Sequence, residues 1–95
     1  MYTRKVTVAA SIGLHARPAA VFVRAVNRTG LPITLSQEGM AGVDGRSLLE
    51  VMSANFAHGV EVEIGVGDCG ADMESVKTAV DHLAQLLRTD LTDPL

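Results

Sequence analysis

A histidine and an arginine stand together at the predicted start of a helix, within residues 13–20 of the chain. Pro18 is expected to be the first helical residue, because a proline lacks only the N–H that would have no intrahelical partner there. A residue before a proline is pushed towards extended angles, so Arg17 should be extended or half in the helix. His15 then lies beside free backbone N–H groups and the positive end of the helix dipole, an environment that binds phosphate. This arrangement favours a histidine that carries a phosphoryl group.

Both side chains have the chemistry that such a role requires. An imidazole nitrogen is a good phosphoryl acceptor near neutral pH. Phosphoryl transfer needs positioning and positive charge rather than further covalent help. A guanidinium supplies charge and can form two parallel hydrogen bonds to phosphate oxygens. The alternative is that His15 is a solvated loop residue and Arg17 a plain surface residue.

Composition indicates a single domain over residues 1–95, with ample material for an aliphatic core. Hydrophobic residues make up 47% of the chain and aromatic residues only 3%. Residues 1–46 hold six basic and two acidic residues (+4), and residues 47–95 hold two basic and nine acidic residues (−7), which together give the net charge of −3. The basic half contains His15, so its surface should attract an acidic partner or a phosphate donor. An acidic chain with few aromatic residues is a poor nucleic-acid binder.

Cysteine usage and hydropathy exclude several other classes. Cys69 is the only cysteine, which excludes an internal disulfide and a thiolate metal cluster and suits a reducing cytosol. The chain has neither a signal-peptide core nor an apolar run of about 20 residues. We therefore expect a cytoplasmic protein with no metal, no cofactor and no membrane insertion.

Hydropathy periods predict the elements that position residues 13–20. Alternation predicts strands, and apolar steps of three and four predict amphipathic helices. The predicted strands are residues 3–9, 32–37, 40–44 and 60–66; the predicted helices are residues 18–27, 48–55 and 73–87, with Ser47 and Asp72 as N-caps and a frayed tail from Thr89 that includes Pro94. The fold class is then a two-layer α/β (α+β) domain of order β-α-β-β-α-β-α, with a four-stranded, mostly antiparallel sheet and three helices on one face.

Residues 13–19, with the sequence Gly-Leu-His-Ala-Arg-Pro-Ala, resemble the phosphorylation motif of the HPr family. This family comprises the histidine-containing phosphocarriers of the bacterial phosphoenolpyruvate:sugar phosphotransferase system. Residues 22–24 extend the match, and residues 45–52 resemble the regulatory-serine segment of the family. The resemblance covers roughly residues 3–88, and the predicted element order agrees with the open-faced sandwich of the family.

The resemblance implies a phosphoryl carrier without turnover of its own, and a monomer. Enzyme I would pass a phosphoryl group to Nδ1 of His15, and the phosphohistidine would pass it to an enzyme IIA domain of a sugar transporter. Arg17 would contact the phosphoryl group. The positions that the resemblance assigns to phosphate or partner binding are Ala16, Pro18, Arg24, Leu48, Leu49 and Met52.

Each residue of the second predicted helix also has an ordinary structural role. Ser47 matches a serine that an HPr kinase/phosphorylase modifies in many relatives, but with Glu50 three residues later it also forms a capping box. Apolar residues on a short helix are most often core. Since Leu48, Leu49 and Met52 cannot all face inward, one or two of them should form an exposed docking patch.

Three residues of this region depart from the usual pattern of the family. Glu50 stands where a small or basic residue is usual, Asn55 where a glycine usually closes the helix, and Phe56 where an aliphatic residue is usual. Asparagine tolerates left-handed angles, so the fold should survive. The departures bear on regulation and on partner choice more than on the chemistry of His15.

Other functions remain as alternatives at this stage. An HPr-like paralogue in a regulatory or nitrogen-related branch would share the His15 chemistry but serve another acceptor. A metallochaperone would need a C-x-x-C in the first loop, and an RNA-binding sheet would need aromatic stacking residues; the chain has neither. A small acylphosphatase-like hydrolase could use the loop at residues 11–17 to bind phosphate. Release of free phosphate from an acyl phosphate would distinguish such an enzyme from a phosphoryl carrier. His58, His82 and Cys69 are assigned no role.

Overall fold

The computed structural model describes residues 2–67 and 69–91. Its elements are β1 (Tyr2–Thr7), α1 (Ala16–Thr29), β2 (Ile33–Gln37), β3 (Val43–Asp44), α2 (Leu48–Ala54), β4 (Glu61–Val66) and α3 (Met73–Leu87). The strands form one sheet in the order β1-β4-β2-β3, with antiparallel neighbours throughout. The predicted fold class and element order are confirmed.

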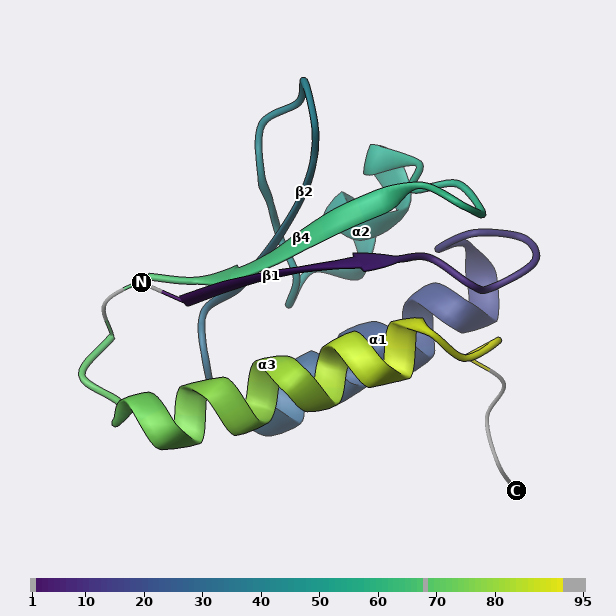
Figure 1. The fold of residues 1–95 in the computed structure, drawn as a ribbon. Helices are drawn as coiled ribbons and strands as arrows, with labels where there is room; N and C mark the ends of the chain where they lie inside the picture. The colour runs from purple at the N-terminus through teal and green to yellow at the C-terminus, as the bar shows by residue number, and fades with distance from the viewer. Residues whose placement is uncertain (1, 68, 92–95) are drawn as a thin grey trace.

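Alternation along the strands separates a covered face of the sheet from an open one. Helices α1 and α3 lie along the covered face, and the β2–β3 hairpin rises away from them (Figure 1). Lys5 pairs with Glu63 in the register of β1 and β4, and neither residue belongs to the core. The buried hydrophobic residues of the strands are Val6, Ile33, Leu35, Val62, Ile64 and Val66.

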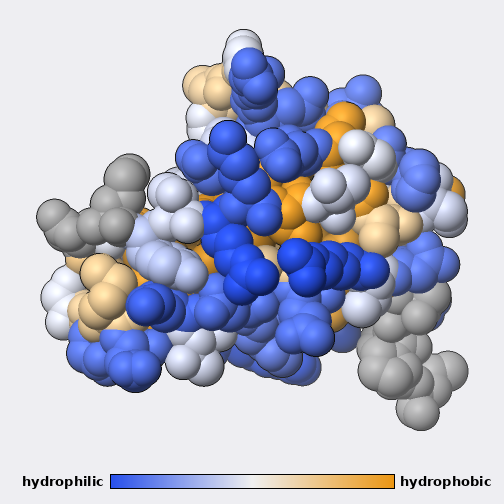
Figure 2. All heavy atoms as spheres, in the orientation of Figure 1, coloured by the Kyte–Doolittle hydropathy of each residue, from blue (hydrophilic) through white to orange (hydrophobic). Residues whose placement is uncertain are grey.

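The helices contribute the other half of the same core. On α1 the buried positions follow helical steps, as expected for an amphipathic helix: Pro18, Ala19, Phe22, Val23 and Val26. Hydrophilic residues cover most of the surface in the view of Figure 2, and hydrophobic residues show mainly in its centre. In the described part of the chain, no helix combines the length and the apolar character that crossing a membrane requires.

Helix ends follow the predicted capping residues. The Asp72 carboxylate accepts hydrogen bonds from the Glu74 N–H at 2.9 Å and the Ser75 hydroxyl at 2.6 Å. The Ser75 hydroxyl is the main cause that holds the pKa of Asp72 below its usual value, so the cap is charged at neutral pH. Gly30 is the C-cap of α1, and its φ of 70° is left-handed and suits glycine.

The third strand is shorter than predicted. Residues 40–44 alternate in sequence, yet β3 contains only Val43 and Asp44. A turn precedes the expected strand, with a φ of 86° at Gly39 and a hydrogen bond from the Met40 N–H to the Gln37 carbonyl at 3.0 Å. Residues 40–42, which we expected to pair, lie outside the sheet. The first strand also ends two residues early, because Ala9 donates its N–H to Leu87 instead of to a strand.

The predicted fraying of the tail from Thr89 is wrong as far as residue 91. Leu91 is 1% exposed and belongs to the core. The Thr89 hydroxyl donates to the Leu86 carbonyl at 2.7 Å and accepts the Leu91 N–H at 3.2 Å. These two hydrogen bonds of Thr89 turn the chain back onto the domain. The amino-acid types of this segment did not indicate such a turn. Pro94 lies outside the described residues.

Candidate functional site

His15 is the N-cap of α1, where the chain changes from extended to helical geometry. Its backbone is extended (φ −128°, ψ 156°), and its side chain makes no capping hydrogen bond. The imidazole is half-buried, and it has no hydrogen-bond partner among residues 2–67 and 69–91. The ring is therefore free to bond to an external group at the positive end of the helix dipole, as predicted.

The start of α1 differs in detail from the prediction. The helix begins at Ala16, so Arg17 is helical rather than extended, and Pro18 is the third helical residue rather than the first. A proline is tolerated throughout the first helical turn, because none of those N–H groups has an intrahelical acceptor. The absence of an N–H on Pro18 therefore predicts that this residue lies in the first turn of the helix, but it does not predict which position of that turn.

Two backbone donors at this helix start are unused. Ala16 and Arg17 have no acceptor for their N–H groups within the described ranges, and the first amide bond to α1 comes from Ala19 to the His15 carbonyl at 3.5 Å. Arg17 is exposed, and its guanidinium also lacks a partner in that part of the chain. An anion bound beside His15 would thus meet two free amides and one free guanidinium.

Ala16 has an unusual backbone for a residue with a side chain. Its φ is 49°, in the left-handed region that costs a non-glycine residue of order 1 kcal/mol or more. Such angles persist where the surrounding structure over-determines them, often at functional sites. The sequence contained no sign of this, since alanine ordinarily indicates right-handed helix.

A rigid segment leads into His15. The Leu14 N–H donates to the Phe56 carbonyl at 2.8 Å, and Leu14 is fully buried. Gly13 has a φ of 75°, and a Cβ at this position would lie 2.5 Å from the same Phe56 oxygen. The segment that follows α2 therefore fixes the approach of the chain to His15, and only glycine fits at residue 13.

The apolar patch on α2 is larger than predicted. Leu48, Leu49 and Met52 are 41%, 78% and 37% exposed, so all three contribute, where we expected one or two. Val51 alone of this helix is buried, because a helix of seven residues presents only about two turns to the core. We define the apolar patch as Leu48, Leu49 and Met52.

Ile12 is a further exposed apolar residue that the sequence analysis did not select. It is 57% exposed and lies three residues before His15. The alternation of buried Val6, Val8 and Ala10 would have placed Ile12 inside, but the strand has already ended. The position of Ile12 in a loop, beyond the end of the strand, was the feature of the sequence that could have indicated its exposure.

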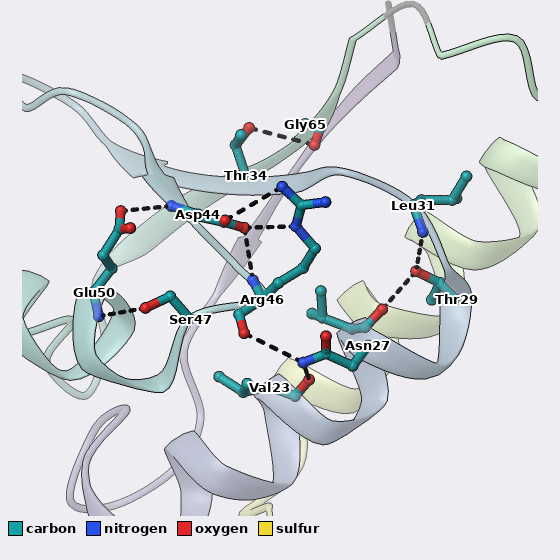
Figure 3. A network of polar contacts seen from close by, with 11 residues as sticks. Val23, Asn27, Thr29, Leu31, Thr34, Asp44, Arg46, Ser47, Glu50 and Gly65 are labelled. Atoms are coloured by element: carbon teal, nitrogen blue, oxygen red, sulfur yellow. Dashed lines mark hydrogen bonds and ion pairs between the residues drawn. The ribbon is translucent and has the colours of Figure 1, made fainter.

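Ser47 belongs to a polar network between β3, α2 and α1 (Figure 3). Its hydroxyl accepts the Glu50 N–H at 3.2 Å, which confirms the predicted cap. The Ser47 N–H donates to the Asp44 carbonyl at 3.1 Å. The amide of Asn27 on α1 donates to the Arg46 carbonyl at 3.3 Å, so this network ties α2 to the helix that carries His15.

The second half of the capping box is replaced by a longer connection. The Glu50 carboxylate accepts the N–H of Asp44 at 3.1 Å, not that of Ser47. The Asp44 carboxylate accepts the Arg46 N–H at 2.9 Å and its Nε–H at 3.0 Å. The Arg46 guanidinium is the main cause that holds the pKa of Asp44 below its usual value. The carboxylates of Glu50 and Asp44 therefore belong to the same network as the Ser47 hydroxyl, and Arg46 is the counter-charge of Asp44.

The other departures from the family pattern fit the fold. Asn55 closes α2 with left-handed angles (φ 58°, ψ 50°), as an asparagine can. Phe56 is fully buried, so its larger ring fills the core and does not enlarge the apolar patch. Glu50 and Asn55 are both exposed, and Glu50 is the departure that adds a charge to the surface.

The remaining candidate residues are scattered over the surface. Arg24 and Arg28 are exposed on α1, and His82 and Cys69 are exposed elsewhere. His58, to which we assigned no role, has its Nδ1 atom 3.2 Å from the Ala10 carbonyl oxygen. Among the residues that the structure describes, no three histidine, cysteine or acidic side chains are grouped so that they could hold a metal ion.

Comparisons with known proteins point to a single family. The family model described as "PTS HPr component phosphorylation site" matches residues 2–89. The chain is 34% identical over 93 residues to the phosphocarrier protein HPr of Streptomyces coelicolor, with 98% of this chain and 95% of the relative covered. It is 38% identical over 91 residues to the HPr-like protein Crh of Bacillus subtilis, with 96% and 100% covered.

A solved structure agrees with this assignment. The crystal structure of a phosphocarrier protein HPr from Bacillus anthracis superimposes with a TM-score of 0.74 at 30% identity, and the match covers 88% of this chain and 93% of that chain. Because the family model spans nearly the whole chain, and because the fold and the relatives agree with it, the protein belongs to the HPr family of phosphocarriers of the phosphotransferase system.

Proposed function

We propose that His15 is the residue that carries the phosphoryl group, with Arg17 and the start of α1 as its binding site. The observation that carries this proposal is the group of unused partners around one helix start: a free imidazole, two free amides and a free guanidinium. Preorganised donors of this kind stabilise the charge on a phosphoryl group during transfer.

The proposed reaction is a transfer between two histidine-type phosphoryl sites. The Nδ1 lone pair of His15 attacks the phosphorus of phospho-enzyme I, the new P–N bond forms, and the bond to enzyme I breaks. The free N–H groups of Ala16 and Arg17 and the Arg17 guanidinium bind the phosphoryl oxygens as their charge is redistributed. In the second step an enzyme IIA nucleophile attacks the phosphorus, the P–N bond to His15 breaks, and the phosphoryl group passes to enzyme IIA and leaves His15 free.

Partner docking is assigned to the apolar patch, extended by Ile12 and by the basic side chain of Arg24. The apolar patch lies on α2, and the segment that follows α2 bonds directly to Leu14 beside His15. Exposed leucine and methionine side chains close to a reactive group fit a protein interface. The basic charge of α1 would attract an acidic surface and accelerate encounter.

We propose phosphorylation of Ser47, by an HPr kinase/phosphorylase, as a regulatory reaction. A phosphate there would carry up to two negative charges beside the carboxylates of Glu50 and Asp44, with Arg46 as the near base. Repulsion would disturb the network that joins α2 to α1 and would place charge at the edge of the apolar patch.

A phosphorylation assay tests the carrier role. The protein is incubated with phosphoenolpyruvate and enzyme I of Streptomyces coelicolor, and the intact mass is measured for the wild type and for His15→Ala. We expect one acid-labile phosphoryl group on the wild type and none on His15→Ala. His82→Ala is the matched control and should retain the label. Label on the His15→Ala variant would place the acceptor elsewhere and refute the assignment.

A second candidate is an HPr-like protein of a regulatory branch, with the same acceptor histidine. Its support is the similarity over 91 residues to the HPr-like protein Crh of Bacillus subtilis, whose solved structure is described as that of a catabolite repression containing protein. A panel of purified enzyme IIA domains separates the two candidates, since a sugar-transport carrier should pass its phosphoryl group to a sugar IIA domain and a regulatory protein should not.

A further inference from the structure

A tight turn delivers the chain to His15. The Gly13 N–H donates to the Ala10 carbonyl at 2.9 Å, which makes Ser11 and Ile12 the central residues of a β-turn. Leu14 and His15 follow at once. Any shift of this turn therefore moves the imidazole and the exposed Ile12 side chain together.

The C-terminal segment holds one side of this turn. The Ser11 N–H donates to the Asp90 carboxylate at 3.0 Å, across 79 positions of the sequence. Asp90 is itself exposed, but the residues around it are fixed. Leu91 is 1% exposed, and Leu87 accepts the Ala9 N–H at 3.0 Å. The carboxylate is thus presented to the turn by a segment anchored on both sides.

His58 holds the opposite side of the turn. Its Nδ1 atom lies 3.2 Å from the Ala10 carbonyl oxygen, and a carbonyl can only accept, so Nδ1 carries the hydrogen. The neighbouring Gly59 N–H donates to the Val8 carbonyl at 2.9 Å, which keeps this segment beside the chain that enters the turn. Ala10 therefore accepts two hydrogen bonds, one from within the turn and one from His58.

We propose that Asp90 and His58 are positioning residues for phosphoryl transfer, which clamp the Ala10–Gly13 turn from two sides and so place His15. This inference rests on the proposed role of His15. Both side chains are exposed and neither contributes to the core. Their loss should hence affect the placement of the imidazole far more than the stability of the fold.

Conservative variants separate this role from a general structural one. Asp90→Ala removes the acceptor for Ser11, whereas Asp90→Asn retains a carbonyl oxygen. His58→Ala removes the donor to Ala10, whereas His58→Asn retains an N–H at the δ position. His82→Ala is the matched control, since His82 is an exposed histidine of α3.

The first measurement is the rate of phosphoryl transfer from phospho-enzyme I. We expect kcat to fall about five- to tenfold for Asp90→Ala and for His58→Ala, because misplacing a reactive group slows the chemical step. KM should rise by a smaller factor than kcat falls, since the apolar patch on α2 is intact and only Ile12 moves with the turn. Asp90→Asn and His58→Asn should recover most of the rate, and the urea midpoint should be unchanged throughout. An unaltered kcat in both alanine variants, or a loss that both conservative variants share, would overturn the proposal.

The second measurement does not depend on enzyme I. The His15 ring is observed by ¹H–¹⁵N NMR while the protein reacts with phosphoramidate, in which the P–N bond of the reagent breaks, ammonia leaves and the imidazole takes the phosphoryl group. We expect slower phosphorylation and shifted His15 ring signals in the alanine variants only. Unchanged signals and rates would refute the clamp. Failure of the wild type to accept a phosphoryl group from enzyme I, with a clear effect here, would refute the carrier role alone.

Discussion

The Phe56 carbonyl oxygen lies 2.5 Å from the point where a Cβ on Gly13 would stand, although the two residues are far apart in the sequence. The same oxygen accepts the Leu14 N–H. The end of α2 and the chain that enters α1 thus meet through backbone atoms alone, immediately before His15. Backbone atoms cannot adjust by a change of rotamer, so this contact determines how far the His15 segment can move.

Gly13→Ala should disturb this contact and slow phosphoryl transfer. The new Cβ must displace backbone, and the φ of 75° is strained for alanine, so we expect a loss of about 2–4 kcal/mol in the free energy of unfolding. Gly39→Ala is the control, since Gly39 has a φ of 86° with nothing within 4 Å. Urea denaturation of both variants gives the difference. Equal losses would show that the close approach of Phe56 has no energetic effect.

Leu49→Ala should weaken partner docking without a change in stability. Leu49 is 78% exposed, so we expect the free energy of unfolding to change by less than about 0.5 kcal/mol. Truncation at the centre of a protein interface typically costs about 1–2 kcal/mol of binding, which would raise KM for phospho-enzyme I roughly 5- to 30-fold. Met73→Ala, at a 52% exposed residue of α3, is the control. An unchanged KM for Leu49→Ala would remove the apolar patch from the proposed interface.

Ser47→Asp should accept the phosphoryl group from enzyme I much more slowly than the wild type. Aspartate caps a helix as well as serine does, so the cause would be the added charge beside Glu50 and Asp44 rather than a lost cap. Ser47→Asn supplies a neutral cap and should retain the rate. Ser47→Ala should cost about 1 kcal/mol of stability. The idea fails if Ser47→Asp and Ser47→Asn transfer at the same rate.

The contact of β1 with α3 should make stability depend on acid pH. The Asp81 carboxylate accepts hydrogen bonds from Arg4 at 2.7 Å and from the Tyr2 hydroxyl at 3.0 Å. The Arg4 guanidinium first, and the Tyr2 hydroxyl second, hold the pKa of Asp81 below its usual value of 3.8. A carboxyl with a lowered folded-state pKa stabilises the fold above its unfolded pKa and loses this contribution as pH falls through the folded value.

Urea midpoints measured against pH for the wild type and Asp81→Asn test this dependence. The wild type should be the more stable protein at neutral pH. Its advantage should begin to shrink as pH falls below the unfolded value of 3.8 and should vanish once Asp81 is protonated in the folded state. If the difference in urea midpoint between the two proteins stays constant across this pH range, the charge of Asp81 does not contribute to the stability difference.

The sequence predicted the parts of the fold that depend on local pattern. The amphipathic period of residues 18–27 identifies α1, and the alternation of residues 60–66 identifies β4, because one face of each must be buried. The Ser47 and Asp72 caps were likewise predictable, since a serine or aspartate before an apolar run satisfies free amides whatever the tertiary structure.

Features that depend on distant contacts were not predictable. The left-handed angle of Ala16 comes from the surroundings, and alanine gives no sign of it. Leu91 is buried only because the chain turns back at Thr89. The Glu50 carboxylate bonds to Asp44 instead of Ser47, since the β3 turn brings that amide within reach. The His15 and Arg17 pair was found through spacing, but their freedom from partners was visible only in three dimensions.

The single reactive end of the molecule has a kinetic consequence. In the proposed function, His15 and the apolar patch serve both the donor and the acceptor, so the two partners would compete and could not be bound together. Each cycle therefore includes a complete dissociation, and a very tight complex with either partner would limit flux through its off-rate. A patch of three modest side chains, assisted by basic charge for rapid encounter, suits a carrier that must leave one partner before it can react with the next.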